Sequence, residues 1–375
     1  MKRFTLHIRM TKKCNADCSY CSSWQHQPIT YMGIQEFKDS IDYIIKDVLP
    51  LYGFDGVEES SISLQYVGGE IAIVPKKILY PCVFYARERF SSIFSSVTDG
   101  VQSNLIGSEK RINSISTLFG KRIGTSVDNL GHSRTVAGSP EKYREILEKN
   151  ISLLNKRRIV PGRIFVVDGE GLKNVEYEIS KANEGGYNLT LRPVFHGGRE
   201  INVAPIEELC ESFGKLFDDW VMKSNISIEP FHQLLNERLY EKTLDNDLAF
   251  RFGCPFQTDC ATVSLNLEPD GDLFVCLDMA DSNQNKLGNA INREFDSELW
   301  KKLNLRKEHL DSSCKSCAYL KSCQGGCMSE AIHSTKSIYG KTDLCPLWKT
   351  IFSKIDRVID VEGVERVKNW CLSIG

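Results

Sequence analysis

What the sequence lacks narrows the class of protein first. No apolar run in its 375 residues approaches the roughly 20 residues of a membrane-spanning helix. A net charge of −2 provides no overall basic field that would favour nucleic acid or an anionic membrane. The first residues, 1–4, lead into a strand pattern without the apolar core of a signal peptide, and no internal repeat or low-complexity tract follows. We therefore expect a cytoplasmic protein with neither a nucleic-acid nor a membrane partner.

Cysteine, in contrast, is abundant, with 14 residues. Disulfides are unlikely in the cytoplasm, so closely spaced cysteines are expected to bind a metal or a cluster. Three cysteines lie near the start of the chain, and eight crowd its last third. The remaining three are isolated in apolar or helical contexts, and we expect them to be small buried hydrophobic residues: Cys82, Cys210 and Cys371.

The cysteines near the start form a C-x3-C-x2-C run of Cys14, Cys18 and Cys21. Three thiolates at this spacing can hold three irons of a [4Fe–4S] cube and leave the fourth iron without a protein ligand. An open iron is a place for chemistry, as an open position is on a catalytic metal. The alternative is a zinc or disulfide triplet, although three cysteines alone make an incomplete zinc site.

The first part of the chain alternates between strand and helix patterns. Segments expected to be strands are 4–10, 61–67, 98–103, 122–127, 163–167 and 189–195. Helical patterns cover 34–48, 76–90, 139–154 and 174–183, the third with Ser139 as N-cap and Pro140 at its first position. Six strand–helix units imply a parallel sheet with crossover helices, fewer than the eight units of a closed barrel. We predict an α/β fold with an open partial (β/α)6 barrel.

The pattern changes in the last third of the chain. After Arg251 the strands become short and glycine and cysteine multiply, and we expect helical periodicity to return only from Leu347. The predicted organisation is a partial barrel, a helical linker, a Cys-rich domain and a C-terminal helix, with the bounds 1–204, 205–250, 251–349 and 350–375.

The first cysteine run, with Tyr20 before its third cysteine, resembles the defining motif of the radical S-adenosylmethionine (radical SAM) enzymes. In that family the free iron is chelated by the amino and carboxylate groups of the methionine moiety. One electron from the cluster breaks the sulfonium bond and releases a 5′-deoxyadenosyl radical, which removes a hydrogen atom from an unactivated C–H bond. The resemblance thus implies a [4Fe–4S] cluster and S-adenosylmethionine as cofactors, with Tyr20 beside the cofactor.

The next strand ends in Gly68, Gly69 and Glu70, which resemble the GGE element of the family. Paired glycines let the backbone approach a ligand closely. A carboxylate at this place is implied to accept hydrogen bonds from the methionine ammonium group. A simple turn is the alternative, because Gly-Gly before Glu is common in turns.

Two further strand ends carry residues implied to contact S-adenosylmethionine. Ser126 and Asp128, with His132 and Arg134 after them, resemble the S-x-D…H…R stretch, in which serine and arginine hold the methionine carboxylate. A solvated loop arginine is the alternative for Arg134. Asn104 ends the third strand and is a candidate contact on the ribose or sulfonium side of the cofactor.

The cysteines of the last third match, in order and spacing, the SPASM domain of radical SAM enzymes that modify peptides and proteins, and are similar to those of anaerobic sulfatase-maturating enzymes. Carried over from that relative, two auxiliary [4Fe–4S] clusters have four cysteine ligands each. The implied first set is Cys254, Cys260, Cys276 and Cys327. The implied second set is Cys314, Cys317, Cys323 and Cys345. Two zinc ribbons are the alternative, since C-x2-C pairs also bind zinc.

Asp278 is the candidate catalytic base. In sulfatase-maturating enzymes an aspartate directly follows the cysteine that matches Cys276, whereas here Leu277 takes that place and Asp278 comes one residue later. On an extended backbone one residue reverses the direction of a side chain. The departure weakens the case for a sulfatase as the substrate.

The resemblance implies an oxidoreductase that modifies a peptide or protein substrate by crosslinking, oxidation or epimerisation. It also implies an electron donor such as flavodoxin or ferredoxin. Two alternatives stay open: a dehydrogenase of small molecules such as sugars or alcohols, and a non-catalytic iron–sulfur scaffold for electron transfer.

Overall fold

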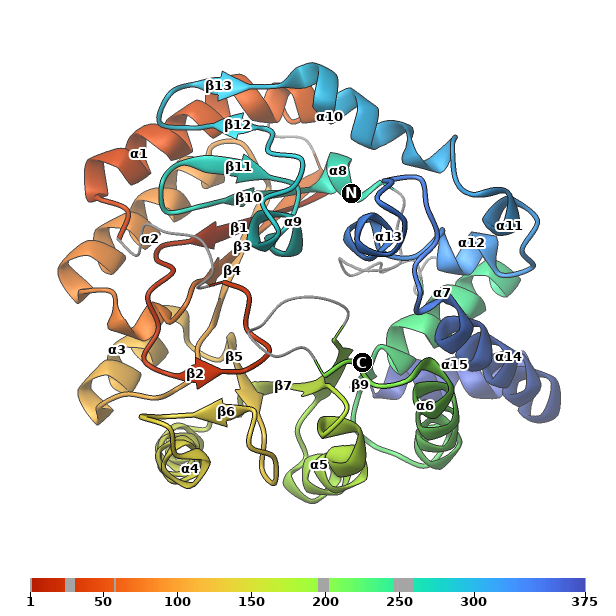
Figure 1. Ribbon diagram of the computed structural model, residues 1–375. Coiled ribbons are helices and arrows are strands. Elements are labelled where there is room, and N and C mark those ends of the chain that lie inside the picture. The colour runs from red at the N-terminus through yellow and green to blue at the C-terminus, as the bar shows by residue number, and fades with distance from the viewer. Residues whose placement is uncertain are drawn as a thin grey trace.

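The computed structural model describes residues 2–23, 31–56, 59–194, 202–245, 248 and 259–374. A sheet of 11 strands runs through the molecule in the order β13-β12-β11-β10-β1-β3-β4-β5-β7-β8-β9. The sheet is not closed, and helices surround it (Figure 1). Within the described ranges, no helix is both long and apolar enough to cross a membrane.

The strands of the partial barrel, which lie within residues 2–193, are parallel and lie where the sequence predicts them. They are β1 (Lys2–Arg9), β3 (Ser60–Val67), β4 (Ser96–Gln102), β5 (Ile123–Val127), β7 (Gly162–Val167) and β8 (Leu189–Pro193). Alternation explains β1, because Phe4, Leu6 and Ile8 are buried while the residues between them are partly exposed. A short β9 (Ile228–Glu229) extends the parallel sheet beside β8. The predicted open partial barrel is confirmed.

Crossover helices connect these strands. The predicted helices are α1 (Ile34–Tyr43), α2 (Lys76–Ser91), α4 (Pro140–Lys156) and α5 (Gly171–Gly185). The chain continues from α1 through a π-helical turn, Ile44–Val48, and a 3-10 turn, Leu49–Tyr52. Ser139 caps α4 as predicted, because its Oγ accepts a hydrogen bond from the backbone N–H of Lys142 at 3.1 Å. Another helix, α3 (Glu109–Phe119), lies where none is predicted.

The Cys-rich part continues the same sheet on the other side of β1. β10 (Ser264–Leu267) pairs with β1 in parallel, and an antiparallel run follows through β11 (Asp272–Phe274), β12 (Gly288–Asn289) and β13 (Glu294–Phe295). Two short helices begin at or next to cysteines: α8 (Cys260–Val263) precedes β10, and α9 (Leu277–Asp281) lies between β11 and β12. The chain then leaves the sheet through α10 (Ser297–Asn304), α11 (Ser312–Lys315), α12 (Leu320–Cys323) and α13 (Met328–Thr335).

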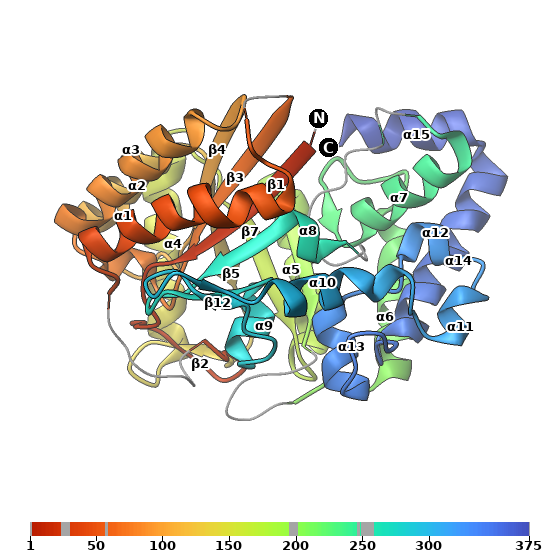
Figure 2. The ribbon, with the colours of Figure 1, turned by 90° about the horizontal axis from the view of Figure 1, so that it is seen from above.

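The expectation that helices return only from Leu347 is therefore wrong, because α10 and α13 each form two turns before that point. The C-terminal α14 (Cys345–Glu362) and α15 (Val364–Ser373) pack against α6 (Ile206–Trp220) and α7 (Phe231–Thr243). The rings of Trp220 and Trp370 lie 4.9 Å apart in this contact. Figure 2 shows this helical group on the opposite side of the molecule from α1, α2 and α3.

Candidate functional site

The first cysteine run follows the carboxyl end of β1 and is tied to a neighbouring strand end. Cys18 lies in β2 (Asp17–Cys18), which pairs antiparallel with β6 (Arg134–Thr135), so that Cys18 faces Arg134. Burial raises the pKa of the Cys14 thiol to about 12, and Cys18 and Cys21 contribute in the same direction because they lie close by. The structure thus brings the three thiols of the run together.

Gly68 and Gly69 pack directly against the backbone of the cysteine loop. The N–H of Gly69 donates to the carbonyl of Thr11 at 2.8 Å, and the N–H of Glu70 donates to the carbonyl of Lys13 at 2.8 Å. A Cβ atom on Gly69 would lie 2.4 Å from the carbonyl oxygens of Lys12 and Lys13, and one on Gly68 would lie 2.8 Å from that of Thr11. Glycine is required at both positions because the loop backbone occupies the space of a side chain.

Glu70 is buried and joins the ends of β3 and β4. Its Oε1 accepts hydrogen bonds from the N–H of Ala72 and the hydroxyl of Ser103, both at 2.7 Å. Its Oε2 accepts from the N–H of Asn104 at 2.6 Å. Burial raises the pKa of Glu70, and these donors act in the opposite direction. The carboxylate is already hydrogen-bonded within the protein, so its contact with a methionine ammonium group stays a prediction.

Asn104 links this carboxylate to the cysteine loop. Its Nδ2 donates to Oδ1 of Asn15 at 2.9 Å and lies 3.5 Å from the sulfur of Cys14. Its Oδ1 accepts from the N–H of Ile106 at 2.8 Å. Asn104 therefore ties the loop at Cys14 and Asn15 to the end of β4. Its contact with the ribose or sulfonium side of the cofactor stays a prediction.

Arg134 is buried, with 6% of its surface exposed, which is unlike a solvated loop arginine. Its Nε donates to the hydroxyl of Tyr143 at 2.7 Å, and its Nη1 donates to the hydroxyl of Tyr20 at 2.5 Å. The Tyr143 hydroxyl in turn donates to the backbone carbonyl of Ser126 at 2.9 Å. One hydrogen-bonded chain thus connects three residues predicted to contact S-adenosylmethionine: Tyr20, Arg134 and Ser126. Their contacts with the cofactor stay predictions.

A hollow of about 230 Å³ lies beside this chain, lined by Tyr20, Asp128, Ser133 and Asp168 among others. Asp128 accepts from the N–H of Gly131 at 2.8 Å and so shapes the turn that leads into β6. The residue His132 of the same turn is exposed.

Three cysteines of the first implied auxiliary set lie close together. Burial raises the pKa of Cys260 to about 12, and Cys327 contributes because it lies nearby. Burial also raises the pKa of Cys276, with contributions from Cys327 and Cys260. These residues come from α8, from the end of β11 and from the start of α13. The fourth implied ligand, Cys254, lies outside the described residues.

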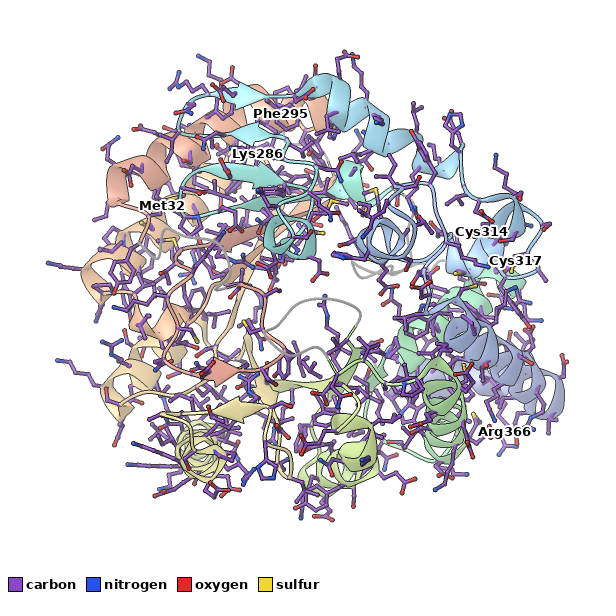
Figure 3. All side chains as sticks on the ribbon, in the orientation of Figure 1. Met32, Lys286, Phe295, Cys314, Cys317 and Arg366 are labelled. Atoms are coloured by element: carbon purple, nitrogen blue, oxygen red, sulfur yellow. The ribbon has the colours of Figure 1, made fainter. Side chains whose placement is uncertain are left out.

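The second implied set surrounds a single hollow. Its lining includes all four cysteines of the set, Cys314, Cys317, Cys323 and Cys345. The space measures about 440 Å³ and is otherwise bordered by apolar and aromatic side chains, among them Phe352, and by Lys341 and Lys349 at its border. Figure 3 labels Cys314 and Cys317, which lie at α11 beside α14. An all-thiol donor set in apolar surroundings suits a thiolate-ligated iron–sulfur cluster, so the residues present fit the implied group.

Among the residues that the structure describes, no three His, Cys, Asp or Glu side chains are arranged to hold a single metal ion. Of the isolated cysteines, Cys82 and Cys371 are fully buried as expected. Cys210 in α6 is only partly buried, although it packs against the core.

Asp278 lies in α9, whose first residue is Leu277. The backbone here is helical, so the assumption of an extended backbone is wrong, and neighbouring side chains diverge by about 100° instead of reversing. Both carboxylate oxygens of Asp278 accept hydrogen bonds from Nη2 of Arg192, at 2.7 and 2.6 Å. Arg192 belongs to β8, so this ion pair bridges the barrel and the Cys-rich part.

A second bridge joins the cysteine loop to the same helix. Nη1 of Arg9 donates to Asp281 at 2.6 Å and to Glu268 at 3.2 Å, and the Lys12 ammonium pairs with Glu268 at 3.0 Å. The Ser22 hydroxyl donates to Asp281 at 3.0 Å. The loop that carries Cys14, Cys18 and Cys21 is therefore fixed to the segment that follows Cys276.

Sequence reasoning missed several residues of these sites. Tyr143 sits on α4 and supports Arg134, and Arg192 positions Asp278. Glu330 is buried, and burial raises its pKa to about 7 while a hydrogen bond from the Thr342 hydroxyl at 2.9 Å acts in the opposite direction. The only signal in the sequence is that Glu330 follows Cys327 by three residues, one helical turn.

Comparison with known proteins identifies the fold. No protein-family model matches the chain, and no curated protein is similar to it in sequence. Its structure is similar to that of native anSMEcpe, an anaerobic sulfatase-maturating enzyme, with bound AdoMet, at a TM-score of 0.73 and 17% identity over 95% of this chain and 98% of that one. The same enzyme with bound AdoMet and Kp18Cys peptide gives a TM-score of 0.71 and 18% identity over the same shares.

A third similar structure is that of Streptococcus suis SuiB bound to S-adenosylmethionine. Its TM-score is 0.59 and its identity 14%, over 92% of this chain and 77% of that one. SuiB has also been crystallised with its precursor peptide SuiA. The chain therefore has the fold of the radical SAM enzymes that carry a SPASM domain, as the cysteine motifs predict.

Proposed function

We propose that the protein is a radical SAM oxidoreductase that removes a hydrogen atom from a side chain or the backbone of a peptide or protein. One observation supports the proposal: the four cysteines of the second implied set, which span 32 residues of the chain, line a single hollow, apart from the three-cysteine run that follows β1. The three thiols of that run lie close together at the barrel, and the hollow lies in the Cys-rich part.

In the proposed site, Cys14, Cys18 and Cys21 would hold a [4Fe–4S] cluster, which would supply the electron for reductive cleavage of S-adenosylmethionine. The chain's own residues position the cofactor. The buried Arg134 offers its guanidinium for the methionine carboxylate and is held by Tyr20 and Tyr143.

The proposed auxiliary cluster sites have four cysteines each: Cys254, Cys260, Cys276 and Cys327 for the first, and Cys314, Cys317, Cys323 and Cys345 for the second. With all irons ligated, these clusters serve electron transfer and not substrate binding. A donor such as flavodoxin or ferredoxin is the proposed source of electrons for the first site.

Asp278 is proposed to accept the proton that the substrate loses along with a hydrogen atom and an electron. Support comes from its place between the barrel and the Cys-rich part, where Arg192 orients its carboxylate. A peptide substrate is favoured because similar structures contain a bound peptide, namely Kp18Cys in anSMEcpe and SuiA in SuiB. The product class is a crosslinked, oxidised or epimerised residue.

The test is anaerobic reconstitution followed by turnover with a deuterated candidate peptide. We expect about twelve irons per chain for three four-iron clusters. We also expect 5′-deoxyadenosine that carries deuterium from the peptide, detected by mass spectrometry. Deuterium transfer from a sugar or alcohol, but from no peptide, would instead indicate a small-molecule dehydrogenase. Twelve irons without any 5′-deoxyadenosine under dithionite would indicate an electron-transfer scaffold.

A further inference from the structure

Arg306 is the largest charged side chain that is completely buried among the residues that the structure describes. It lies in the 3-10 turn Leu305–Lys307 after α10, and its exposed fraction is 0%. Its Nη2 donates to the carbonyl of Gly325 at 2.9 Å, and its Nη1 donates to the carbonyl of Ile338. Its Nε is buried without a hydrogen-bond acceptor. Within the described part of the chain, no carboxylate forms an ion pair with this guanidinium.

A buried cation that forms no ion pair is costly, so negative groups are required nearby. Arg306 acts to lower the pKa of the buried Glu330, but burial raises that pKa to about 7 and the two side chains form no ion pair. Burial lowers the pKa of Arg306, whereas four thiols act in the opposite direction because they lie close to it. They are Cys260, Cys327, Cys314 and Cys323. Two of these thiols belong to the first auxiliary set and two to the second. The carbonyl of Gly325, which Arg306 binds, lies in the chain between Cys323 of the second set and Cys327 of the first, and Gly325 lines the hollow of the second set. The guanidinium therefore lies between the two sets.

We propose that Arg306 is the shared counter-ion of the two auxiliary clusters. The inference rests on the proposed cluster sites. A cluster held by four thiolates is negatively charged, and reduction adds one more negative charge. A fixed cation in apolar surroundings stabilises the reduced form and so raises the reduction potential. Because one guanidinium faces both sets, it raises both potentials together, and its unpaired Nε–H is available to a thiolate.

The competing interpretation is that Arg306 only connects two loops through the carbonyls of Gly325 and Ile338. A connecting role affects folding and iron loading but leaves the potentials of a fully loaded protein unchanged. A role as counter-ion affects the potentials at full loading. The two interpretations thus differ in a quantity that does not depend on enzyme activity.

The experiment compares the full-length holoenzyme with Arg306→Gln, Arg306→Lys and the control Lys307→Gln. Lys307 is the next residue and is exposed, so its charge is screened by water. Each protein is reconstituted anaerobically, its iron is counted, and the reduction potentials are measured by titration with electron paramagnetic resonance (EPR) detection. In Arg306→Gln we expect both auxiliary potentials to fall by at least the equivalent of tenfold, which is 59 mV for one electron. In Arg306→Lys the fall is less than half as large, and in Lys307→Gln there is none.

Full iron content in Arg306→Gln with both potentials unchanged, or with only one changed, overturns the proposal. If Arg306→Gln does not load, Arg306→Lys decides: full loading with a small but measurable fall in both auxiliary potentials supports the counter-ion, whereas full loading with both potentials unchanged, or failure to load, overturns it. Zinc in place of iron in the wild type would remove the cluster sites and this inference with them. Twelve irons without S-adenosylmethionine cleavage would remove the proposed activity alone.

Discussion

The cysteine sites at the two ends of the chain are built differently. The barrel site has three thiols, and a dense polar network from the neighbouring strand ends surrounds them, including Glu70, Asn104 and Arg134. The second auxiliary site has four thiols around a mainly apolar hollow. A metal site that binds a second molecule needs side chains that orient that molecule, whereas a fully ligated site needs only its ligands and exclusion of water. The contrast therefore separates the proposed reaction site from the proposed electron-transfer sites.

The largest effect is expected when one of the proposed cysteine ligands is removed from either site. Cys18→Ala should abolish cleavage of S-adenosylmethionine and reduce iron from about twelve to about eight per chain. Cys317→Ala should cause a similar loss of iron but leave dithionite-driven cleavage measurable. Iron analysis and chromatography of 5′-deoxyadenosine test both variants. Equal loss of cleavage in the two variants would contradict the division of roles.

Asp278→Asn tests the bridge between the two regions. We expect formation of the modified peptide to fall by about a hundredfold or more, the usual contribution of a positioned base. Cleavage of S-adenosylmethionine should change little, because Asp278 is not part of the barrel site. Arg192→Gln is the matched control, since it breaks the ion pair but keeps the carboxylate. If both variants lose product equally, Asp278 acts only through the ion pair.

Glu330 provides a pH test of the Cys-rich region. Its folded pKa of about 7 is above its ordinary value, so the stability it contributes is present at low pH and is lost as the pH rises through about 7. We therefore compare the free energy of unfolding of Glu330→Gln with that of the wild type at each pH. This difference should favour the variant by about 2–3 kcal/mol more at pH 8 than at pH 5. Denaturant unfolding of equally loaded proteins measures the difference. The exposed Glu308→Gln serves as control, and a pH-independent difference for Glu330→Gln would exclude the shift.

The smallest expected effect concerns the polar network of the barrel site. Tyr143→Phe removes the hydroxyl that joins Arg134 to Ser126, and we expect binding of S-adenosylmethionine to weaken by about tenfold. Equilibrium binding measurements test this. Tyr80→Phe is the matched control, because the Tyr80 hydroxyl also donates to a backbone carbonyl, that of Ser114 at 2.8 Å. An equal change in both variants would mean that Tyr143 has no special role at the cofactor.

The sequence is informative where a pattern is local. The alternation of apolar and polar residues in the sequence predicts β1 and its parallel neighbours. Ser139 before Pro140 predicts the start of α4. It is uninformative where the pattern is short or the partner is distant. α10 has only two turns, and its three apolar residues that contact the core, Leu299, Trp300 and Leu303, form a pattern too short to distinguish a helix from a loop. Nothing in the run Leu305-Arg306-Lys307 indicates that its arginine is buried, because the burial comes from loops near Gly325 and Ile338.

The candidate site shows the same limit. The spacing of the first three cysteines predicts a cluster site, and the resemblance to SPASM domains implies the ligand sets of the other two. The supporting residues are set by folding: Arg192 meets Asp278 across 86 positions, and Tyr143 reaches Arg134 from a crossover helix. Such pairs obey no local rule, so only the structure reveals them.

The most direct test of the central claim is EPR of the reduced, fully loaded protein with and without S-adenosylmethionine. One open iron and two closed clusters predict that the cofactor alters the signal of one cluster and leaves the other two unchanged, and that Cys18→Ala removes the altered signal. A cofactor that alters no cluster signal, or alters all three, would contradict the account.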